Sequence, residues 1–83
     1  MEKIQIKVEQ RHIDAGTPGD KCNCPIGLAL KDSGMNDIEV YYESIWVDSR
    51  VVRTPRIARK FAIDFDLSLP VEPFEFELTT AYW

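Results

Sequence analysis

Two segments near the ends of the chain, residues 3–9 and 71–78, alternate between apolar and polar residues. This period of two is typical of strands with one buried face, so both segments are predicted to be strands. The outward positions carry Lys3 and Lys7 in the first segment and glutamates in the second. Because opposite charges on paired strands contribute about 0.2–1 kcal/mol, the pattern favours a fold in which these two strands are neighbours. Pro73 cannot donate a ladder hydrogen bond, which favours an edge position or the start of the strand.

A helix is predicted over residues 24–33. Pro25 suits the first helical position, and the residue before it, Cys24 or Asn23, is expected to cap the helix. Gly34 follows the last helical residue and is predicted to close the C-terminus. Apolar residues cover much of the circumference, so we expect this helix to be buried against the sheet.

A second helix is predicted over residues 55–66, where a proline follows Thr54, the expected N-cap. Ile57, Phe61 and Phe65 recur at a spacing of four, and basic residues lie on or near the opposite side. This spacing is typical of an amphipathic helix that packs on a sheet through its apolar face.

Three short strand-like segments, residues 38–42, 44–47 and 50–53, lie between the two helices. Asp48 and Ser49 are turn-forming residues, so a hairpin or short meander is predicted here. The resulting order is β-α-β-β-(β)-α-β. It predicts an α+β fold in a single domain, residues 1–83, with one small antiparallel or mixed sheet and two helices packed on one face.

Two further segments complete the chain. Residues 10–23 are rich in turn-forming residues and are predicted to be a loop. Within it, Gln10–Ala15 has room for a single helical turn that Gly16 would stop. Residues 79–83 end on two aromatic side chains, which we expect to pack on the domain or on a partner chain.

Composition limits the classes of partner. A chain of 83 residues has little room for a deep private pocket, so a small-molecule site is expected at the surface or between copies of the chain. The net charge of −4 argues against non-specific nucleic-acid binding, which needs a positive field. No apolar run approaches the roughly 20 residues that span a membrane, and the N-terminus lacks the apolar core of a signal peptide. Together with only two cysteines, this favours a cytoplasmic protein without a membrane partner.

The residue types that carry chemistry gather between residues 11 and 30, which contain the only histidine, His12, and both cysteines, Cys22 and Cys24. All three are zinc ligands by type, but three ligands with C-x-C spacing do not match the usual sites, so neither a metal nor a cofactor is expected. Alternatively, Cys22 or Cys24 would act as a nucleophile whose pKa is lowered by the helix start. His12 would be its base, oriented by Asp14 or Asp20. A single histidine limits acid–base chemistry. We therefore predict that the protein is not an enzyme, and a small cysteine-dependent enzyme remains an alternative.

Anion binding is a further possibility at the same helix start. Residues 16–24 offer backbone amides, a hydroxyl and a lysine, but they do not match a phosphate-binding P-loop, and an ordinary connecting loop would look the same. Half of the basic residues lie between residues 50 and 60. Arg56 is among them and falls in the first turn of a predicted helix, where it opposes the helix dipole unless an anion or an acidic partner compensates. The alternative is a solvated helix face.

The segment from Val8 to Leu30, with H-I-D-A-G and C-P-I-G-L-A-L, and residues 70–78, P-V-E-P-F-E-F-E-L, resemble a family of small proteins of tailed phages and prophages. The family pattern runs roughly H-I-x-x-G, then C-P-I-A-L-A-L, and ends in P-F-x-F. Gly27 stands where the pattern usually has alanine, which is expected to lower helix stability. The resemblance covers most of the chain. It implies a phage origin and an accessory role in the infected bacterial cell, without an established active site.

That resemblance implies two functions. One is to counter host defence by sequestering, without cleavage, a nucleotide-derived immune signal in a homo-oligomer. The other is to bind and block a host defence or regulatory protein. The polar loop, the helix start and the arginines suit the first function, which we expect, whereas the acidic strand and the aromatic tail suit the second. The candidate ligand-binding residues are Arg11, His12, Thr17, Asp20, Lys21, Cys24, Arg50, Arg53 and Arg56.

Overall fold

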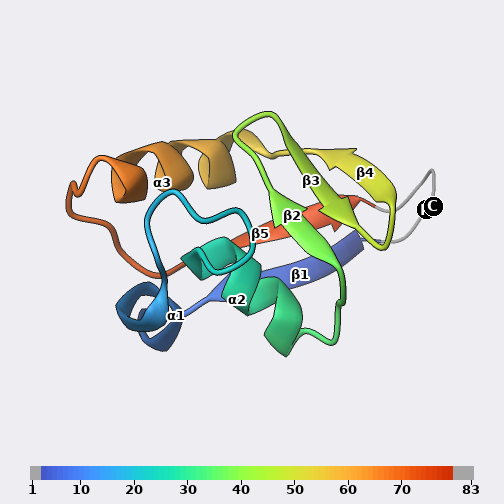
Figure 1. The fold of residues 1–83 in the computed structure, drawn as a ribbon, viewed down its shortest axis with the longest axis horizontal. Helices are drawn as coiled ribbons and strands as arrows, with labels where there is room; N and C mark the ends of the chain where they lie inside the picture. Colours follow the sequence, from blue (N-terminus) through green and yellow to red (C-terminus); the bar gives the residue numbers. More distant parts are fainter. Residues whose placement is uncertain (1–2, 80–83) are drawn as a thin grey trace.

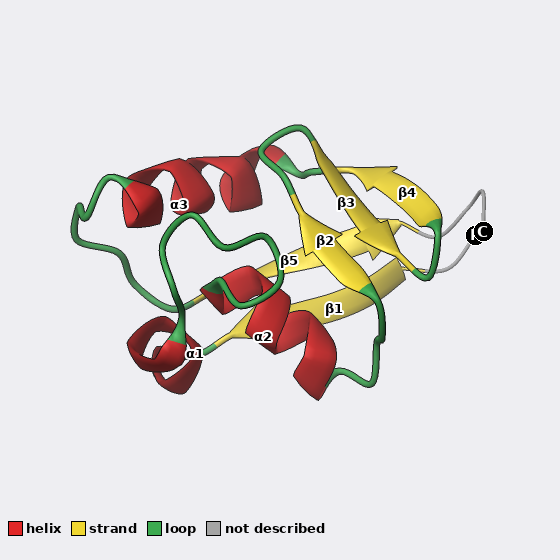
Figure 2. Cartoon of the chain, in the orientation of Figure 1, coloured by secondary structure: helices red, strands yellow, loops and turns green. Residues whose placement is uncertain are grey.

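The computed structural model describes residues 3–79, which contain five strands and three helices. The predicted α+β class is confirmed, and Figure 2 separates its helices from its strands. Residues 80–83, where most of the predicted aromatic tail falls, lie outside the described residues. The elements follow the chain as β1 (Lys3–Val8), α1 (Gln10–Ala15), α2 (Pro25–Asp32), β2 (Ile38–Val40), β3 (Ser44–Val47), β4 (Arg50–Arg53), α3 (Arg56–Asp66) and β5 (Phe74–Thr79) (Figure 1).

The first and last strands are neighbours, as their charge pattern predicts. β1 and β5 pair antiparallel over their full length. Lys3 Nζ lies 3.8 Å from Glu77 Oε2, and Lys7 Nζ lies 3.9 Å from Glu75 Oε1. These exposed ion pairs contribute at most about 1 kcal/mol each, so their main effect is on register. β5 begins directly after Pro73, at the place where a residue without an N–H is tolerated.

The other three strands form the predicted meander, β2-β3-β4, with antiparallel pairing throughout. In place of the single expected sheet, the described strands therefore form two sheets. One reason lies at the outer edge of β2, where the N–H of Val40 donates to the carbonyl of Lys21 at 2.8 Å. The loop before α2 thus occupies one of the two edges at which a further strand could join the meander.

Helix α2 begins and ends with the capping residues that the sequence predicts. Cys24 is the N-cap, and its sulfur accepts a hydrogen bond from the N–H of Gly27. At the other end Gly34 has φ of 89°, and the N–H groups of Gly34 and Met35 donate to the carbonyls of Lys31 and Leu30. This is the Schellman arrangement that a glycine after a helix commonly forms.

The start and the buried face of α3 differ from the prediction. Pro55, not Thr54, occupies the N-cap position, because the Thr54 hydroxyl donates instead to the carbonyl of Tyr41 at 2.9 Å. Ala58 and Phe61 are buried, whereas Ile57 is 54% exposed. The helix is thus rotated so that alanine lies closest to the core, and Ile57 contributes apolar surface to solvent. No helix within residues 3–79 combines the length and the apolar character needed to cross a membrane.

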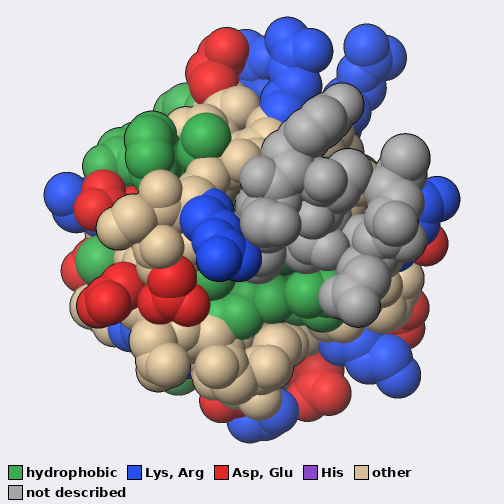
Figure 3. Space-filling view, turned by 90° about the vertical axis from the view of Figure 1, so that its right-hand side faces the viewer, with side chains coloured by type: hydrophobic (Ala, Val, Ile, Leu, Met, Phe, Trp, Pro, Cys, Tyr) green, Lys and Arg blue, Asp and Glu red, His purple; other side chains and the backbone are tan. Residues whose placement is uncertain are grey.

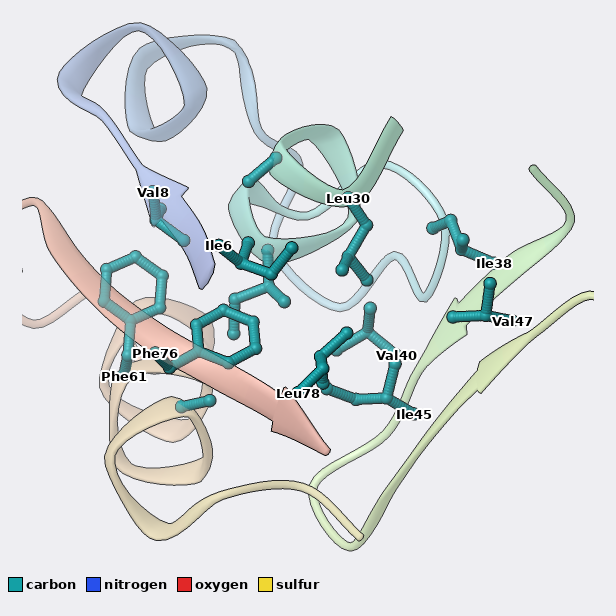
Figure 4. Close-up of a cluster of buried hydrophobic side chains, with 13 residues drawn as sticks. Ile6, Val8, Leu30, Ile38, Val40, Ile45, Val47, Phe61, Phe76 and Leu78 are labelled. Carbon is teal, nitrogen blue, oxygen red and sulfur yellow. The ribbon is translucent and has the colours of Figure 1, made fainter. Parts of the chain in front are cut away.

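One hydrophobic core joins the two sheets to α2 and α3 (Figure 4). Side chains of β1 and β5 point inward to meet those of β2 and β3, while α2 and α3 each contribute apolar side chains. The helical turn α1 contacts α2, so the 16–24 loop (residues 16–24) begins and ends against the same helix. The core side chains labelled in Figure 4 are Ile6, Val8, Leu30, Ile38, Val40, Ile45, Val47, Phe61, Phe76 and Leu78.

Candidate ligand-binding pocket

A pocket of about 710 Å³ lies where the 16–24 loop meets the start of α2, the end of β2 and α3. In Figure 1 the loop, coloured cyan, runs beside α3. The volume falls within the roughly 300–1,000 Å³ of small-ligand sites. Four aromatic residues line the pocket: Tyr41 and Tyr42 after β2, and Phe61 and Phe65 on α3. The other lining residues are Thr17, Pro18, Gly19, Asp20, Lys21, Cys24, Pro25, Ile26, Val40, Ala62 and Asp66.

Asp20 holds the 16–24 loop in shape. Its Oδ1 accepts hydrogen bonds from the N–H groups of Cys22 and Asn23, both at 2.9 Å. These backbone donors lower the pKa of Asp20 below its ordinary value. Its carboxylate therefore stabilises the conformation of the loop, as aspartate does in many turns. Asp20 contributes to the pocket by holding the loop that forms one of its walls.

Asp66, the last residue of α3, connects three walls of the pocket. Its Oδ1 accepts from the N–H of Gly19 at 2.9 Å, and its Oδ2 accepts from the hydroxyl of Tyr42 at 2.5 Å. The bond to this carboxylate raises the pKa of Tyr42. Asp66 thus ties the loop and the segment after β2 to the end of α3.

Among the described residues, the only basic one that lines the pocket, Lys21, is engaged by a neighbouring carboxylate. Lys21 Nζ lies 3.7 Å from Glu39 Oε1, and the same oxygen accepts a hydrogen bond from the Tyr41 hydroxyl at 2.5 Å. The charge of Glu39 raises the pKa of Lys21, and its hydrogen bond raises the pKa of Tyr41. With Asp20 and Asp66 also lining the pocket, carboxylates outnumber the single ammonium group.

Cys24 is a helix cap whose thiol stays protonated. The sequence predicts a lowered pKa at a helix start, but burial raises the pKa of Cys24 despite the hydrogen bond from Gly27. The other thiol, Cys22, donates to the carbonyl of Ile38 at 3.4 Å. Among the described residues, histidines, cysteines and carboxylates form no group of three or more that could hold a metal ion.

We expect the substitution Cys24→Ser to leave the free energy of unfolding within about 1 kcal/mol of wild type, because serine is a strong N-cap. The substitution Cys24→Ala removes the cap and should cost about 1 kcal/mol more than Cys24→Ser. Urea denaturation compares the two variants. Equal stability of both would contradict the capping role, and rapid alkylation of Cys24 at neutral pH would contradict the raised pKa of its thiol.

Arg11 and His12, two of the predicted ligand-binding residues, lie outside the pocket lining. His12 is buried, its Nδ1 accepts from the N–H of Glu9 at 2.9 Å, and its Nε2 lies 2.6 Å from Asp32 Oδ2. Since Nδ1 accepts, the proton is on Nε2 and is donated to Asp32. Arg11 Nη1 lies 2.9 Å from the same carboxylate oxygen. The two residues fasten α1 to the end of α2, and both ring nitrogens of the histidine are occupied.

Asp32 is predicted to make stability pH-dependent. The hydrogen bond from His12, with the nearby charge of Arg11, lowers the pKa of Asp32 in the folded protein. The unfolded chain therefore binds a proton more readily, so this contribution is complete above the ordinary carboxyl pKa of about 4 and is lost as pH falls through the lower folded value. Denaturation of wild type and Asp32→Asn between about pH 5 and pH 3 should show a flatter decline for the variant. Equal slopes would contradict the assignment.

Arg50, Arg53 and Arg56 do not line the pocket either. Arg50 and Arg53 are the first and last residues of β4, which lies at the right of Figure 1. The view from that side shows several Lys and Arg side chains that project from the surface (Figure 3). Within residues 3–79 no carboxylate forms an ion pair with any of the three, whereas Arg59 pairs with Glu43 at 3.2 Å. In a single chain these arginines are therefore not placed to complete the pocket.

Of the nine predicted site residues, the pocket brings together Thr17, Asp20, Lys21 and Cys24. Sequence reasoning missed its aromatic walls and Asp66. One signal was present: Tyr41 and Tyr42 are adjacent after a strand, and neighbouring strand residues point to opposite faces, so both cannot enter the core.

Comparison with known proteins adds no relative. The chain matches no model of a protein family, no curated protein and no solved structure. The resemblance to phage proteins therefore stays a prediction.

Proposed function

We propose that the protein binds a small nucleotide-derived molecule through its base, in the pocket between the 16–24 loop and α3, and releases it unchanged. The observation that carries this proposal is the pocket lining, in which four aromatic side chains accompany the carboxylates of Asp20 and Asp66. Bases stack on aromatic side chains with a gain of about 1–3 kcal/mol each, and polar groups at the edge of such a site then select among them.

Binding without cleavage is supported by the state of the residues that were candidates for catalysis. The raised pKa of Cys24 keeps its thiol protonated, and its sulfur already accepts the N–H of Gly27. His12 is engaged by Glu9 and Asp32 outside the pocket lining. In this proposal the ligand is sequestered, which is the role implied by the resemblance to phage accessory proteins.

The predicted homo-oligomer belongs to the same proposal. Phosphate groups attached to a bound base would extend beyond the pocket lining, where a second chain could supply Arg50 or Arg53. Mass in solution, measured with and without ligand, tests this step. A strict monomer under both conditions would restrict the proposal to binding of the base by one chain.

Thermal denaturation in the presence of nucleosides, mononucleotides and cyclic dinucleotides tests the proposed function. Ligand at 100 times Kd should stabilise the fold by about 2.7 kcal/mol, and mass spectrometry after heating should recover it unchanged. Tyr42→Ala removes a pocket wall, whereas Trp46→Ala removes an aromatic residue of similar exposure, 39% against 42%, that does not line the pocket. We expect only Tyr42→Ala to abolish the shift. No shift with any compound, or equal loss in both variants, would contradict the proposal.

A further inference from the structure

We infer that the pocket selects a guanine-type base, because Asp66 presents a pair of hydrogen-bond acceptors beside the aromatic walls. This inference rests on the proposed function and adds which base is bound and which edge of that base faces the protein. Asp66 is the carboxylate that accepts the N–H of Gly19 and the hydroxyl of Tyr42, each on a different oxygen.

Lone pairs remain available on the Asp66 carboxylate. A carboxylate offers about four acceptor positions over its two oxygens, and the structure uses one position on each. One acceptor per oxygen is therefore left for a ligand. Two parallel acceptors side by side match two parallel N–H donors, the geometry by which carboxylates bind planar, donor-bearing groups.

Among the common bases, only guanine carries two adjacent donors, N1–H and the 2-amino group. Adenine and cytosine place a ring acceptor next to their amino group, so that one lone pair would face a carboxylate oxygen. Uracil and thymine have one N–H flanked by two carbonyl oxygens. A site that accepts two hydrogen bonds discriminates strongly against a ligand that leaves one acceptor unpaired.

The charges of the pocket favour this base over a phosphate. Asp20 and Asp66 line the pocket with Lys21, whose ammonium group lies 3.7 Å from Glu39. A phosphate placed among these residues would meet more negative than positive charge. The neutral base is the part of a nucleotide that suits the pocket, so the nucleoside alone should bind.

Titration calorimetry with guanosine, inosine and adenosine tests the inference. Inosine keeps N1–H and lacks the 2-amino group, so it isolates one of the two bonds. We expect guanosine to bind at least tenfold more tightly than inosine, and adenosine to bind more weakly than both. Methylguanidine, which has paired donors without a fused ring, should bind far more weakly than guanosine, because it covers little of the aromatic wall.

The substitution Asp66→Asn provides a change of specificity that a structural role alone would not produce. Asparagine offers one acceptor and one donor, the complement of the N6–H and N1 edge of adenine, so adenosine should become preferred over guanosine. Asp64→Asn is the matched control: it removes a carboxylate two residues away that pairs with Lys60, and it should leave the order unchanged. Tyr42→Phe keeps the Asp66 carboxylate intact, so this variant should still prefer guanosine. It provides a second test of the inference if Asp66→Asn does not fold.

The outcomes separate this inference from the proposed function. If adenosine binds wild type as tightly as guanosine, or if folded Asp66→Asn keeps the wild-type order, the selection of guanine is wrong and base binding stands. If adenosine becomes preferred in Tyr42→Phe, selection by the carboxylate is also overturned. If no nucleoside or nucleotide binds wild type, the proposed function fails together with the inference.

Discussion

The substitution Gly27→Ala is expected to lower the free energy of unfolding by about 2–3 kcal/mol, because a side chain at this position overlaps the backbone of the 16–24 loop. A Cβ atom on Gly27 would lie 2.5 Å from the carbonyl oxygen and 3.0 Å from the carbonyl carbon of Cys22. Cys22 cannot move away easily, since its N–H is bonded to Asp20. From helix propensity alone the same change would stabilise the protein by about 1 kcal/mol, so the two accounts differ in sign.

Urea denaturation measures the effect of Gly27→Ala, and Gly19→Ala serves as the control. A Cβ on Gly19 meets no atom within 4 Å, so only its φ of 74° opposes the substitution, at a cost of about 1–2 kcal/mol. We expect Gly27→Ala to be the more destabilising of the two and also to weaken ligand binding, because the displaced loop forms a pocket wall. A neutral or stabilising Gly27→Ala would show that the loop does not pack tightly on α2.

The substitution His12→Ala is expected to cost about 2–3 kcal/mol of stability while leaving the ligand affinity of the folded protein within about twofold. The side chain is buried, with 4% of the residue exposed, and it satisfies the N–H of Glu9 and the carboxylate of Asp32. Alanine would leave a cavity, and the N–H of Glu9 and the carboxylate of Asp32 would both lose their hydrogen bond to the imidazole. Affinity should persist because His12 does not line the pocket.

Arg11→Ala is the control for His12→Ala, since Arg11 binds the same oxygen of Asp32 from an exposed position. Exposed ion pairs contribute at most about 1 kcal/mol, so Arg11→Ala should be much less destabilising. The opposite pattern for the histidine variant, with normal stability and lost binding, would place His12 in the site, as the sequence predicts.

Features that depend on neighbouring residues in the sequence were predictable. Alternation and charge identified β1 and β5 as paired strands, and Pro25 and Gly34 marked the ends of α2. These signals come from periods of two and of 3.6 residues and from backbone geometry, which act locally. Among the contacts between distant segments, opposite charges indicated the pairing of β1 with β5, but nothing indicated the division into two sheets. The bond from Val40 to Lys21, which places the 16–24 loop at one edge of the meander, has no counterpart in any local pattern.

The candidate site shows the same division. The 16–24 loop was identified because it is rich in polar and turn-forming residues, and six of its residues line the pocket: Thr17, Pro18, Gly19, Asp20, Lys21 and Cys24. The arginines were expected there because of their charge, but Arg50 and Arg53, at the two ends of β4, do not line the pocket. Phe61 and Phe65 follow core spacing on α3, and spacing cannot distinguish a side chain that fills the core from one that also forms the wall of a pocket.

Chemical-shift mapping by NMR during titration with guanosine tests the central claim most directly, since it locates the ligand on the protein. The backbone amides of Gly19, Tyr42 and Asp66 should show the largest changes, because the three are joined by hydrogen bonds at the pocket. Changes centred on Arg50 and Arg53, or no changes at saturating nucleoside concentration, would contradict base binding in this pocket.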